Sequence, residues 1–343
     1  MGLQIAEIIE KKPIEFSDLK GKILTVDAFN TIYQFISTIR QPDGTPLQDS
    51  KGRISSHLSG LFYRNLNLLS EGIKLIYVFD GKAPELKGRT HELRNEAKDE
   101  AREKYEAAKG NEDVDEMGKY ARQLTHLTGE MIRESKELLL AMGIAVIQAP
   151  GEGEAQASYI AMKENNVYAI ASQDYDSLIF EAPYLIQNLT MSRKRKTRSG
   201  WVDIKPQLIE LKSVLNQLEI TQDQLICIGI LSGTDYNPGG VKGIGPKKAL
   251  KLVKEFKEPE KIFEAVKALE LEGKYKLDFD WKAVFDLIKH PDLDKDYKIE
   301  FPKFDFEKVK QILMEHDFSE ERINSQFEKV KDLREKQKQR TLF

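Results

Sequence analysis

The sequence contains one cysteine, and this scarcity excludes two kinds of site. Cys227 has no second cysteine with which to form an intrachain disulfide, and a cysteine-based zinc site needs more than one thiol. The residue lies in the apolar run 225–231, so we expect it to pack in the core of a protein that stays in a reducing compartment.

Long apolar runs are also missing. No run approaches the roughly 18 residues that a membrane-spanning helix needs. Glu7, Glu10 and two lysines interrupt the early apolar residues, so the start of the chain does not read as a signal peptide. We therefore expect a soluble, cytoplasmic protein with no membrane contact.

Net charge is nearly absent, although charged residues make up 32% of the chain. The 53 basic and 56 acidic residues leave a formal charge of −3, whereas a nucleic-acid-binding protein is usually basic. An average hides segregation, because an acidic pocket beside basic surfaces gives the same total. Composition therefore does not decide for or against a nucleic-acid partner.

Short apolar runs rich in β-branched residues alternate with helical patterns. The runs 23–26, 75–79, 145–148, 168–172 and 184–187 predict strands, and 55–69, 131–142 and 154–163 predict helices. This alternation indicates an α/β fold, with a mainly parallel central sheet flanked by helices. Residues 88–130 are dense in charge and predict helices standing off the core, or a solvated insertion. From residue 204 onward the pattern is mostly helical, and 328–340 predict a charged helix or tail.

Acidic residues follow four of the predicted strands. Because the functional crevice of such a sheet lies outside the carboxyl ends of its strands, we expect these acids to converge at one edge. A further acid follows the apolar run 226–231. The complete set is Asp27, Asp80, Glu152, Glu154, Asp174, Asp176 and Asp235.

The spacing within two pairs supports this convergence. Asp174 and Asp176 share one face if the chain there is extended. Glu152 and Glu154 reach one pocket only if the chain turns into a helix, and Pro150 and its neighbouring glycines suit such a turn. Each acid taken singly reads equally well as a helix cap. Capping does not explain paired carboxylates at two places.

So many carboxylates in one pocket need cations to neutralise them. A set of oxygen ligands without His or Cys suits Mg²⁺, with Mn²⁺ as a substitute. Two such ions would stabilise the attacking and leaving oxygens of an in-line phosphoryl displacement and lower the pKa of a water molecule. The acids therefore predict phosphodiester hydrolysis that depends on divalent metal.

A glycine-rich turn at 239–245 leads into a helix that is predicted to begin near Pro246. Glycines let backbone N–H groups approach a phosphate, and a helix N-terminus favours an anion. The turn resembles the phosphate clamp of helix–hairpin–helix elements, although a plain glycine turn is the alternative. The residues expected to contact DNA here are Lys242, Gly243, Gly245, Lys247 and Lys248.

Four motifs make the chain resemble the structure-specific 5′-nuclease superfamily, and within it flap endonucleases of the archaeal type, over nearly its whole length. They are Val78–Lys82, Gly151–Ala155, Ala171–Asp176 and Gly233–Tyr236. The resemblance implies one 5′-nuclease domain, 1–330, and a charged tail, 331–343. The domain would comprise an N-terminal part (1–87), a helical arch (88–130), an internal part (131–260, with the helix–hairpin–helix at 225–256) and C-terminal helices (261–330).

The resemblance also assigns roles to residues. The seven acids match the metal ligands and catalytic carboxylates of the family. Lys87 and Arg94 match the lysine and arginine that orient the scissile phosphate, and they lie seven apart, on one helix face. Tyr33 matches the aromatic on which a base stacks near the cut. Without the family, surface charge would be the better interpretation of the first two, and core packing of the tyrosine.

Three further features concern partners. The basic block at Arg193, Lys194, Arg195 and Lys196 predicts either contact with duplex phosphates or a solvated turn. Region 40–57 resembles the element that opens the junction and recognises a 3′ flap, with a thin acidic cluster of Asp43 and Asp49. The segment Gln339–Phe343 begins like a sliding-clamp peptide and stops before its paired aromatics.

The expected activity is therefore Mg²⁺-dependent cleavage of branched double-stranded DNA at the base of a 5′ flap, as in Okazaki-fragment maturation and DNA repair. The resemblance adds K⁺ at the helix–hairpin–helix, a monomeric state and a location at the nucleoid. The alternatives are a 5′-exonuclease or junction nuclease of the same superfamily, a non-catalytic scaffold that binds branched DNA, and a small-molecule phosphatase. A scaffold would have no use for the seven acids, and a phosphatase none for the glycine-rich turn.

Overall fold

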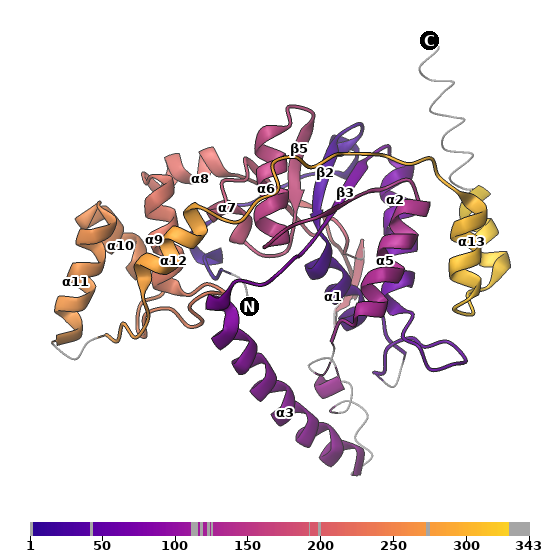
Figure 1. Ribbon diagram of the computed structural model, residues 1–343, viewed down its shortest axis with the longest axis horizontal. Coiled ribbons are helices and arrows are strands. Elements are labelled where there is room, and N and C mark those ends of the chain that lie inside the picture. Colours follow the sequence, from indigo (N-terminus) through magenta and orange to yellow (C-terminus); the bar gives the residue numbers. More distant parts are fainter. Residues whose placement is uncertain are drawn as a thin grey trace.

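The computed structural model describes residues 3–41, 44–110, 116, 119–121, 124, 126–191, 193–197, 200–271 and 275–328. Its centre is a seven-stranded sheet in the order β1-β9-β6-β5-β2-β3-β4 (Figure 1). The strands are β1 (Lys12–Pro13), β2 (Ile23–Asp27), β3 (Lys74–Phe79), β4 (Ala145–Gln148), β5 (Val167–Ala171), β6 (Tyr184–Gln187) and β9 (Gln207–Glu210).

The middle of this sheet is parallel, as the sequence predicts. Strand β2 pairs in parallel with β3 and β5, and β4 and β6 extend the parallel set outward. Strands β9 and β1 then add antiparallel to β6. The prediction of mostly helical structure from residue 204 onward misses β9, because this four-residue strand has two adjacent apolar residues and no alternation of its own.

Alternate side chains of β3 enter two different cores, one on each face of the sheet. Leu75, Tyr77 and Phe79 pack with α1 (Ala28–Thr38), α2 (Ser56–Ser70), α5 (Gly129–Ala141) and α13 (Phe306–Met314). Ile76 and Val78 pack with α6 (Gly153–Lys163) and α7 (Asp176–Ile179). A strand buried on both faces needs apolar residues at every position, which explains the continuous apolar run at 75–79.

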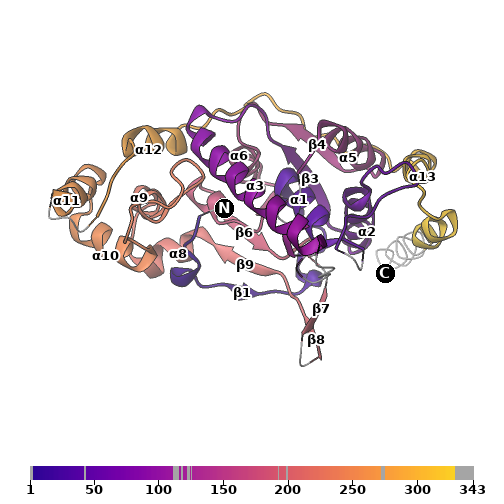
Figure 2. The same cartoon turned by 90° about the horizontal axis from the view of Figure 1, so that it is seen from below.

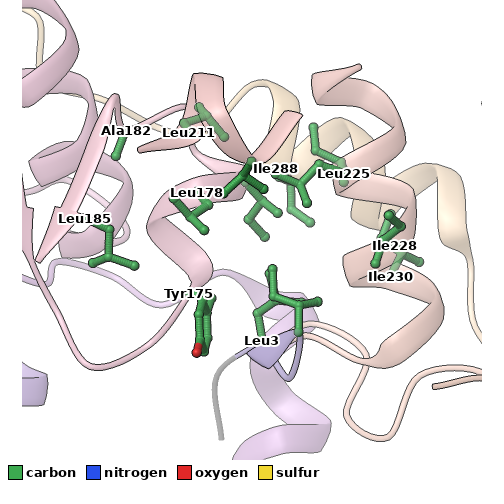
Figure 3. Packing of buried hydrophobic residues seen from close by; sticks show 14 of the residues in the cluster. Leu3, Tyr175, Leu178, Ala182, Leu185, Leu211, Leu225, Ile228, Ile230 and Ile288 are labelled. Atoms are coloured by element: carbon green, nitrogen blue, oxygen red, sulfur yellow. The ribbon is translucent and has the colours of Figure 1, made fainter. Parts of the chain in front are cut away.

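The second of these cores continues into a group of helices beyond the sheet. These helices are α8 (Leu211–Leu218), α9 (Gln222–Ser232), α10 (Pro246–Phe256), α11 (Pro259–Leu271) and α12 (Trp281–Lys289). Figure 3 shows Leu225 and Ile228 of α9 beside Ile288 of α12, with Leu3 packed below them. Cys227 is buried in the same cluster, as predicted for a core residue.

Helix α3 (Gly88–Gly110) projects away from the sheet, and the 3₁₀ turn Glu85–Lys87 precedes it (Figures 1 and 2). Its ion pairs, such as Lys104 with Glu100, join exposed side chains within the helix. The expectation of charged helices standing off the core is therefore met for 88–110. Among the residues that the structure describes, no helix is both long and apolar enough to cross a bilayer.

Most of the basic block lies in the first strand of a hairpin, whereas the sequence offered a solvated turn as one alternative. Strand β7 (Lys194–Thr197) pairs antiparallel with β8 (Gly200–Asp203), and the two project beside β9 and β1 (Figure 2). Arg193 precedes the hairpin, and its guanidinium pairs with Glu71 at 3.0 Å and lies 4.2 Å from the ring centre of Phe16.

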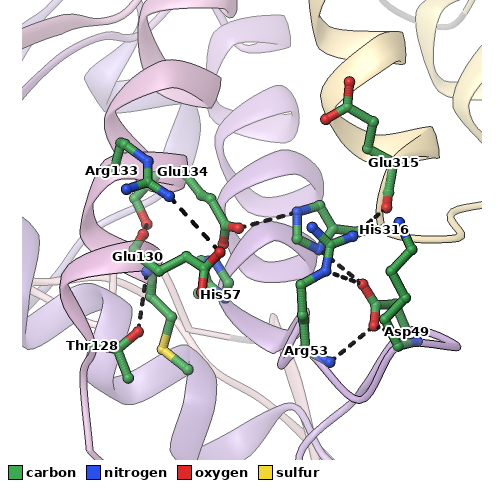
Figure 4. Close-up of polar contacts among 12 residues, drawn as sticks. Asp49, Arg53, His57, Thr128, Glu130, Arg133, Glu134, Glu315 and His316 are labelled. Carbon is green, nitrogen blue, oxygen red and sulfur yellow. Dashed lines mark hydrogen bonds and ion pairs between the residues drawn. The ribbon is translucent and has the colours of Figure 1, made fainter.

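A buried polar network joins the loop before α2 to the chain after α13 (Figure 4). The Glu134 carboxylate lies 3.0 Å from Nε2 of His57 and 3.3 Å from Nε2 of His316. Nδ1 of His316 lies 3.4 Å from Asp49, which also accepts a 2.7 Å hydrogen bond from Nε of Arg53. Three segments distant in sequence therefore share one set of ionisable groups.

The contact between α1 and α2 predicts a strong effect of one methyl group. A Cβ atom at Gly60 would lie 2.2 Å from Cγ of Phe35, a ring that is only 2% exposed and has no room to move. We expect Gly60→Ala to lower the free energy of unfolding by roughly 1–3 kcal/mol. Gly129→Ala, at the open first residue of α5, is the control, and thermal unfolding of both variants is the measurement. Equal melting temperatures would contradict this account of the packing.

Candidate active site

Six of the seven predicted carboxylates lie at or shortly after the carboxyl ends of parallel strands, and the seventh lies after a helix. Asp27 ends β2 and caps α1, Asp80 follows β3, and Glu152 caps α6, whose first turn holds Glu154. Asp174 follows β5, and Asp235 follows α9. The prediction that Asp174 and Asp176 share a face of extended chain is wrong, because the chain bends there and Asp176 begins α7.

Backbone N–H groups orient several of these carboxylates. Oδ1 of Asp80 accepts a 2.6 Å hydrogen bond from the N–H of Gly153, and a Cβ atom at that glycine would lie 2.5 Å from the same oxygen. Glu154 accepts from Ser177 at 3.1 Å, and Asp176 accepts from Leu3 at 3.0 Å. The start of the chain is therefore part of the site, although the sequence gives no sign of this.

Burial and mutual repulsion raise the pKa of these acids. Burial, with repulsion from Asp80 and Asp174, raises the pKa of Asp27 to about 8. Burial, with repulsion from Asp174 and Asp235, raises the pKa of Asp176 to about 7. The pKa of Glu154 rises well above its usual value for the same two reasons. The carboxylates are therefore close enough to interact, and their negative charge is undercompensated.

One cation lies among the acids. Nζ of Lys87 donates to Glu152, and it lies 3.7 Å from Oδ2 of Asp235 and 5.5 Å from the ring centre of Tyr236. Burial alone would lower the pKa of Lys87, but the carboxylates of Glu152, Asp235 and Asp80 raise it above its usual value. The amine therefore stays charged and neutralises one side of the cluster.

The donor set suits a hard divalent cation, because it consists of carboxylate oxygens gathered in a largely buried, negatively charged cluster. Within the described ranges, no three His, Cys, Asp or Glu side chains already have the arrangement of a metal site. Partners of the carboxylates explain this: Asp80, Glu154 and Asp176 accept backbone N–H groups, and Lys87 holds Glu152.

The glycine-rich turn joins α9 to α10 as predicted. Gly239, Gly240 and Gly243 have positive φ angles, and Gly245 caps α10, which begins at Pro246. A Cβ atom at Gly240 would lie 2.4 Å from the carbonyl oxygen of Leu231, so this close approach requires glycine.

The lysines of this turn lie on the surface. Lys242 is exposed, Lys247 pairs with Glu7 at 3.3 Å, and Lys248 donates to the carbonyl of Gly243 at 2.8 Å. The side chains of Lys242, Lys247 and Lys248 are therefore all accessible to solvent.

The structure describes the remaining predicted residues only in part. Tyr33 is 41% exposed on α1. Arg94 lies on α3, but its side chain is outside the described part of the chain, as are those of Lys194, Arg195 and Lys196. Asp43 and the tail from Gln339 to Phe343 are also outside it.

Besides Leu3, two further residues of the site escaped the sequence analysis. Asn30 donates from Nδ2 to Oδ2 of Asp174 at 2.6 Å, and Thr90 donates from Oγ1 to the carbonyl oxygen of Asp235 at 2.5 Å. Each lies three residues after a predicted site residue, Asp27 or Lys87. That spacing was the available signal, because residues three apart on a helix share a face.

Comparison with known proteins gives consistent matches. The profile of the XPG N-terminal domain matches residues 2–101, and that of the XPG I-region matches 143–235. The chain is 49% identical to flap endonuclease 1 of Aeropyrum pernix, over 98% of this chain and 96% of that protein.

Solved structures agree with these matches. Flap endonuclease-1 from Methanococcus jannaschii has a TM-score of 0.73 and 39% identity, covering 97% of this chain and 98% of that one. The catalytic core of Rad2 in complex with DNA substrate shares the fold, with a TM-score of 0.72 and 24% identity, covering 96% of this chain and 100% of that one.

The raised pKa of Asp176 predicts that its ionised form destabilises the metal-free fold by an amount that depends on pH. The group has an ordinary pKa of 3.8 and a folded value of about 7, so its contribution to stability falls as pH rises between them. We expect metal-free Asp176→Asn to be more stable than the wild type at pH 8 by roughly 1–3 kcal/mol, and by less at pH 6.

Thermal unfolding at both pH values, with and without Mg²⁺, is the measurement. Mg²⁺ should stabilise the wild type more than the variant, since it takes over the neutralising role. Asp286→Asn, at an exposed position on α12, is the control and should show no such pH dependence. If Asp176→Asn is more stable than the wild type by the same amount at both pH values, removal of a repelled negative charge is excluded as the cause.

Proposed function

The chain belongs to the flap endonuclease family, and we propose that its seven carboxylates form the catalytic metal centre of this activity. It is a structure-specific 5′-flap endonuclease, a nuclease that acts on DNA in replication and repair. The observation that carries the proposal is the convergence of Asp27, Asp80, Glu154 and the other acids from separate elements into one electrostatically coupled pocket.

The family depends on divalent metal, and we assign the site to two Mg²⁺ ions, with Mn²⁺ as a substitute. When bound, these ions supply charge neutralisation at the phosphate and a lowered pKa for attacking water. Asp27, Asp80, Glu152, Glu154, Asp174, Asp176 and Asp235 would hold them. The sheet supplies the acids in fixed positions, so little reorganisation is needed.

Lys87 and Arg94 complete the site in this proposal. The Lys87 amine lies among the carboxylates, at the base of the projecting helix α3. A scissile phosphate that enters the site would be a second anionic partner for this amine, in addition to the Glu152 carboxylate. Arg94, two turns further along α3, would then face the same phosphate and counter the charge that develops in the transition state.

Four surfaces would bind the branched substrate. Duplex phosphates dock on the Gly239–Lys248 turn and on the basic block at 193–196, which grip the backbone without reading bases. A base next to the cut stacks on the exposed ring of Tyr33. The 5′ flap passes under an arch formed by residues 88–130.

Finer features of the proposal concern partners and context. We assign K⁺ to the helix–hairpin–helix, an incomplete sliding-clamp contact to Gln339–Phe343, and a monomeric state with a location at the nucleoid. Residues 1–330 would act as one nuclease domain and 331–343 as its tail.

Cleavage of an end-labelled 5′-flap duplex tests the activity and the arch together. We expect a Mg²⁺-dependent cut at or one nucleotide inside the junction, abolished by EDTA and by a bulky group on the 5′ end of the flap. Asp176→Ala should lower the rate by roughly 10³-fold or more and leave junction binding intact.

Each alternative activity predicts a different product. Stepwise shortening from the 5′ end would identify an exonuclease, and binding without cleavage would identify a scaffold. Loss of binding and cleavage together in Asp176→Ala would assign that residue a folding role instead.

The glycine turn predicts a specific change in salt dependence. Lys242→Ala combined with Lys247→Ala removes two phosphate contacts, so the slope of log affinity against log salt should fall by about 2 for duplex DNA of any sequence. Lys163→Ala with Lys212→Ala is the matched control. Both lysines are exposed, one at the end of α6 and one at the start of α8, near the amino ends of the parallel strands and away from the acids. An unchanged slope in the first pair would remove this turn from the interface.

A further inference from the structure

Asn30 is hydrogen-bonded to two acids of the site, one through its backbone and one through its side chain. Its N–H donates to Oδ1 of Asp27 at 3.0 Å, and its Nδ2 donates to Oδ2 of Asp174 at 2.6 Å. The two acids come from β2 and β5, which are neighbours in the sheet. The residue therefore connects two carboxylates that repel each other.

Asn30 holds Asp174 through its side chain, whereas backbone N–H groups contribute to the orientation of three other acids. Asp80, Glu154 and Asp176 accept hydrogen bonds from backbone N–H groups, which the fold supplies whatever the side chain of the donor residue. The bond to Asp174 comes from an amide that a single substitution removes. The identity of residue 30 thus contributes to the position of this carboxylate.

The chemistry of an amide suits this place. A donated N–H favours the ionised form of a carboxylate and fixes the plane of its two oxygens. An amide is neutral, so it orients the carboxylate without supplying a positive charge that would oppose a divalent cation. Lys87, on the other side of the cluster, orients Glu152 but does bring such a charge. Asp174 also repels Asp27, Glu154 and Asp176, so its placement affects the whole cluster.

We propose that Asn30 is a positioning residue that holds Asp174 ready for the divalent cation and so sets the affinity of the site for metal. This inference rests on the proposed function, in which Asp174 is a metal ligand. Groups of this kind, which orient a ligand without touching the ion, typically change metal affinity by about 10–100-fold when they are lost.

Binding of Mn²⁺ to the full chain without DNA, measured by electron paramagnetic resonance or calorimetry, tests the proposal without relying on cleavage. Asn30→Ala and Asn30→Leu both remove the donor, one leaving space and the other filling it, so at least one should fold. We expect each folded variant to bind Mn²⁺ about 10–100-fold more weakly than the wild type. At saturating Mn²⁺ the cleavage rate should return to within a few-fold of wild type.

Gln34→Leu is the matched control. It removes a side-chain hydrogen bond of the same helix, the 3.1 Å bond from Thr190, without touching an acid. Its Mn²⁺ affinity should equal that of the wild type. Wild-type affinity in the folded Asn30 variants would overturn this inference alone, whereas absence of Mn²⁺ binding in the wild type would overturn the proposed metal centre as well.

Discussion

Repulsion among the clustered carboxylates is the constraint on which the rest of this structure depends. Isolated in water, Asp27 and Asp176 would ionise at low pH, but burial and their neighbours raise their pKa values to about 8 and about 7. The folded chain keeps these groups together at a cost in stability, because each would gain free energy by separating. The surrounding fold has to supply that free energy from its two apolar cores.

The parallel sheet does this by fixing the backbone on both sides of each acid. Strands β2, β3 and β5 are buried on both faces, so their ends cannot move apart without exposing Leu75, Ile76 and the rest of the two cores. The helices that follow then turn N–H groups toward the acids, as Gly153 does for Asp80. Rigid strand ends and helix starts together hold the carboxylates against their repulsion.

The base of α3 is joined to the same cluster. Lys87 donates to Glu152, and Thr90 donates to the carbonyl oxygen of Asp235, so the first turn of the projecting helix is bonded to two different acidic segments. The rest of α3 has exposed charge and few apolar contacts. The position of the base of α3 therefore depends on the acidic cluster.

The sequence alone determined the strands at the centre of the sheet, the edge at which the acids gather and the glycine turn before Pro246. These features depend on local properties: continuous apolar runs, acids directly after them, and glycine where φ must be positive. It missed β9, because four residues with two adjacent apolar side chains show no alternation. It also took the segment of Asp174 and Asp176 as extended, although the chain bends there. Only the tertiary structure decided that Leu3 and Asn30 contact the acids, since those pairings join residues 144 or more positions apart. No local pattern encodes such a contact, because it depends on how the strands are ordered in the sheet.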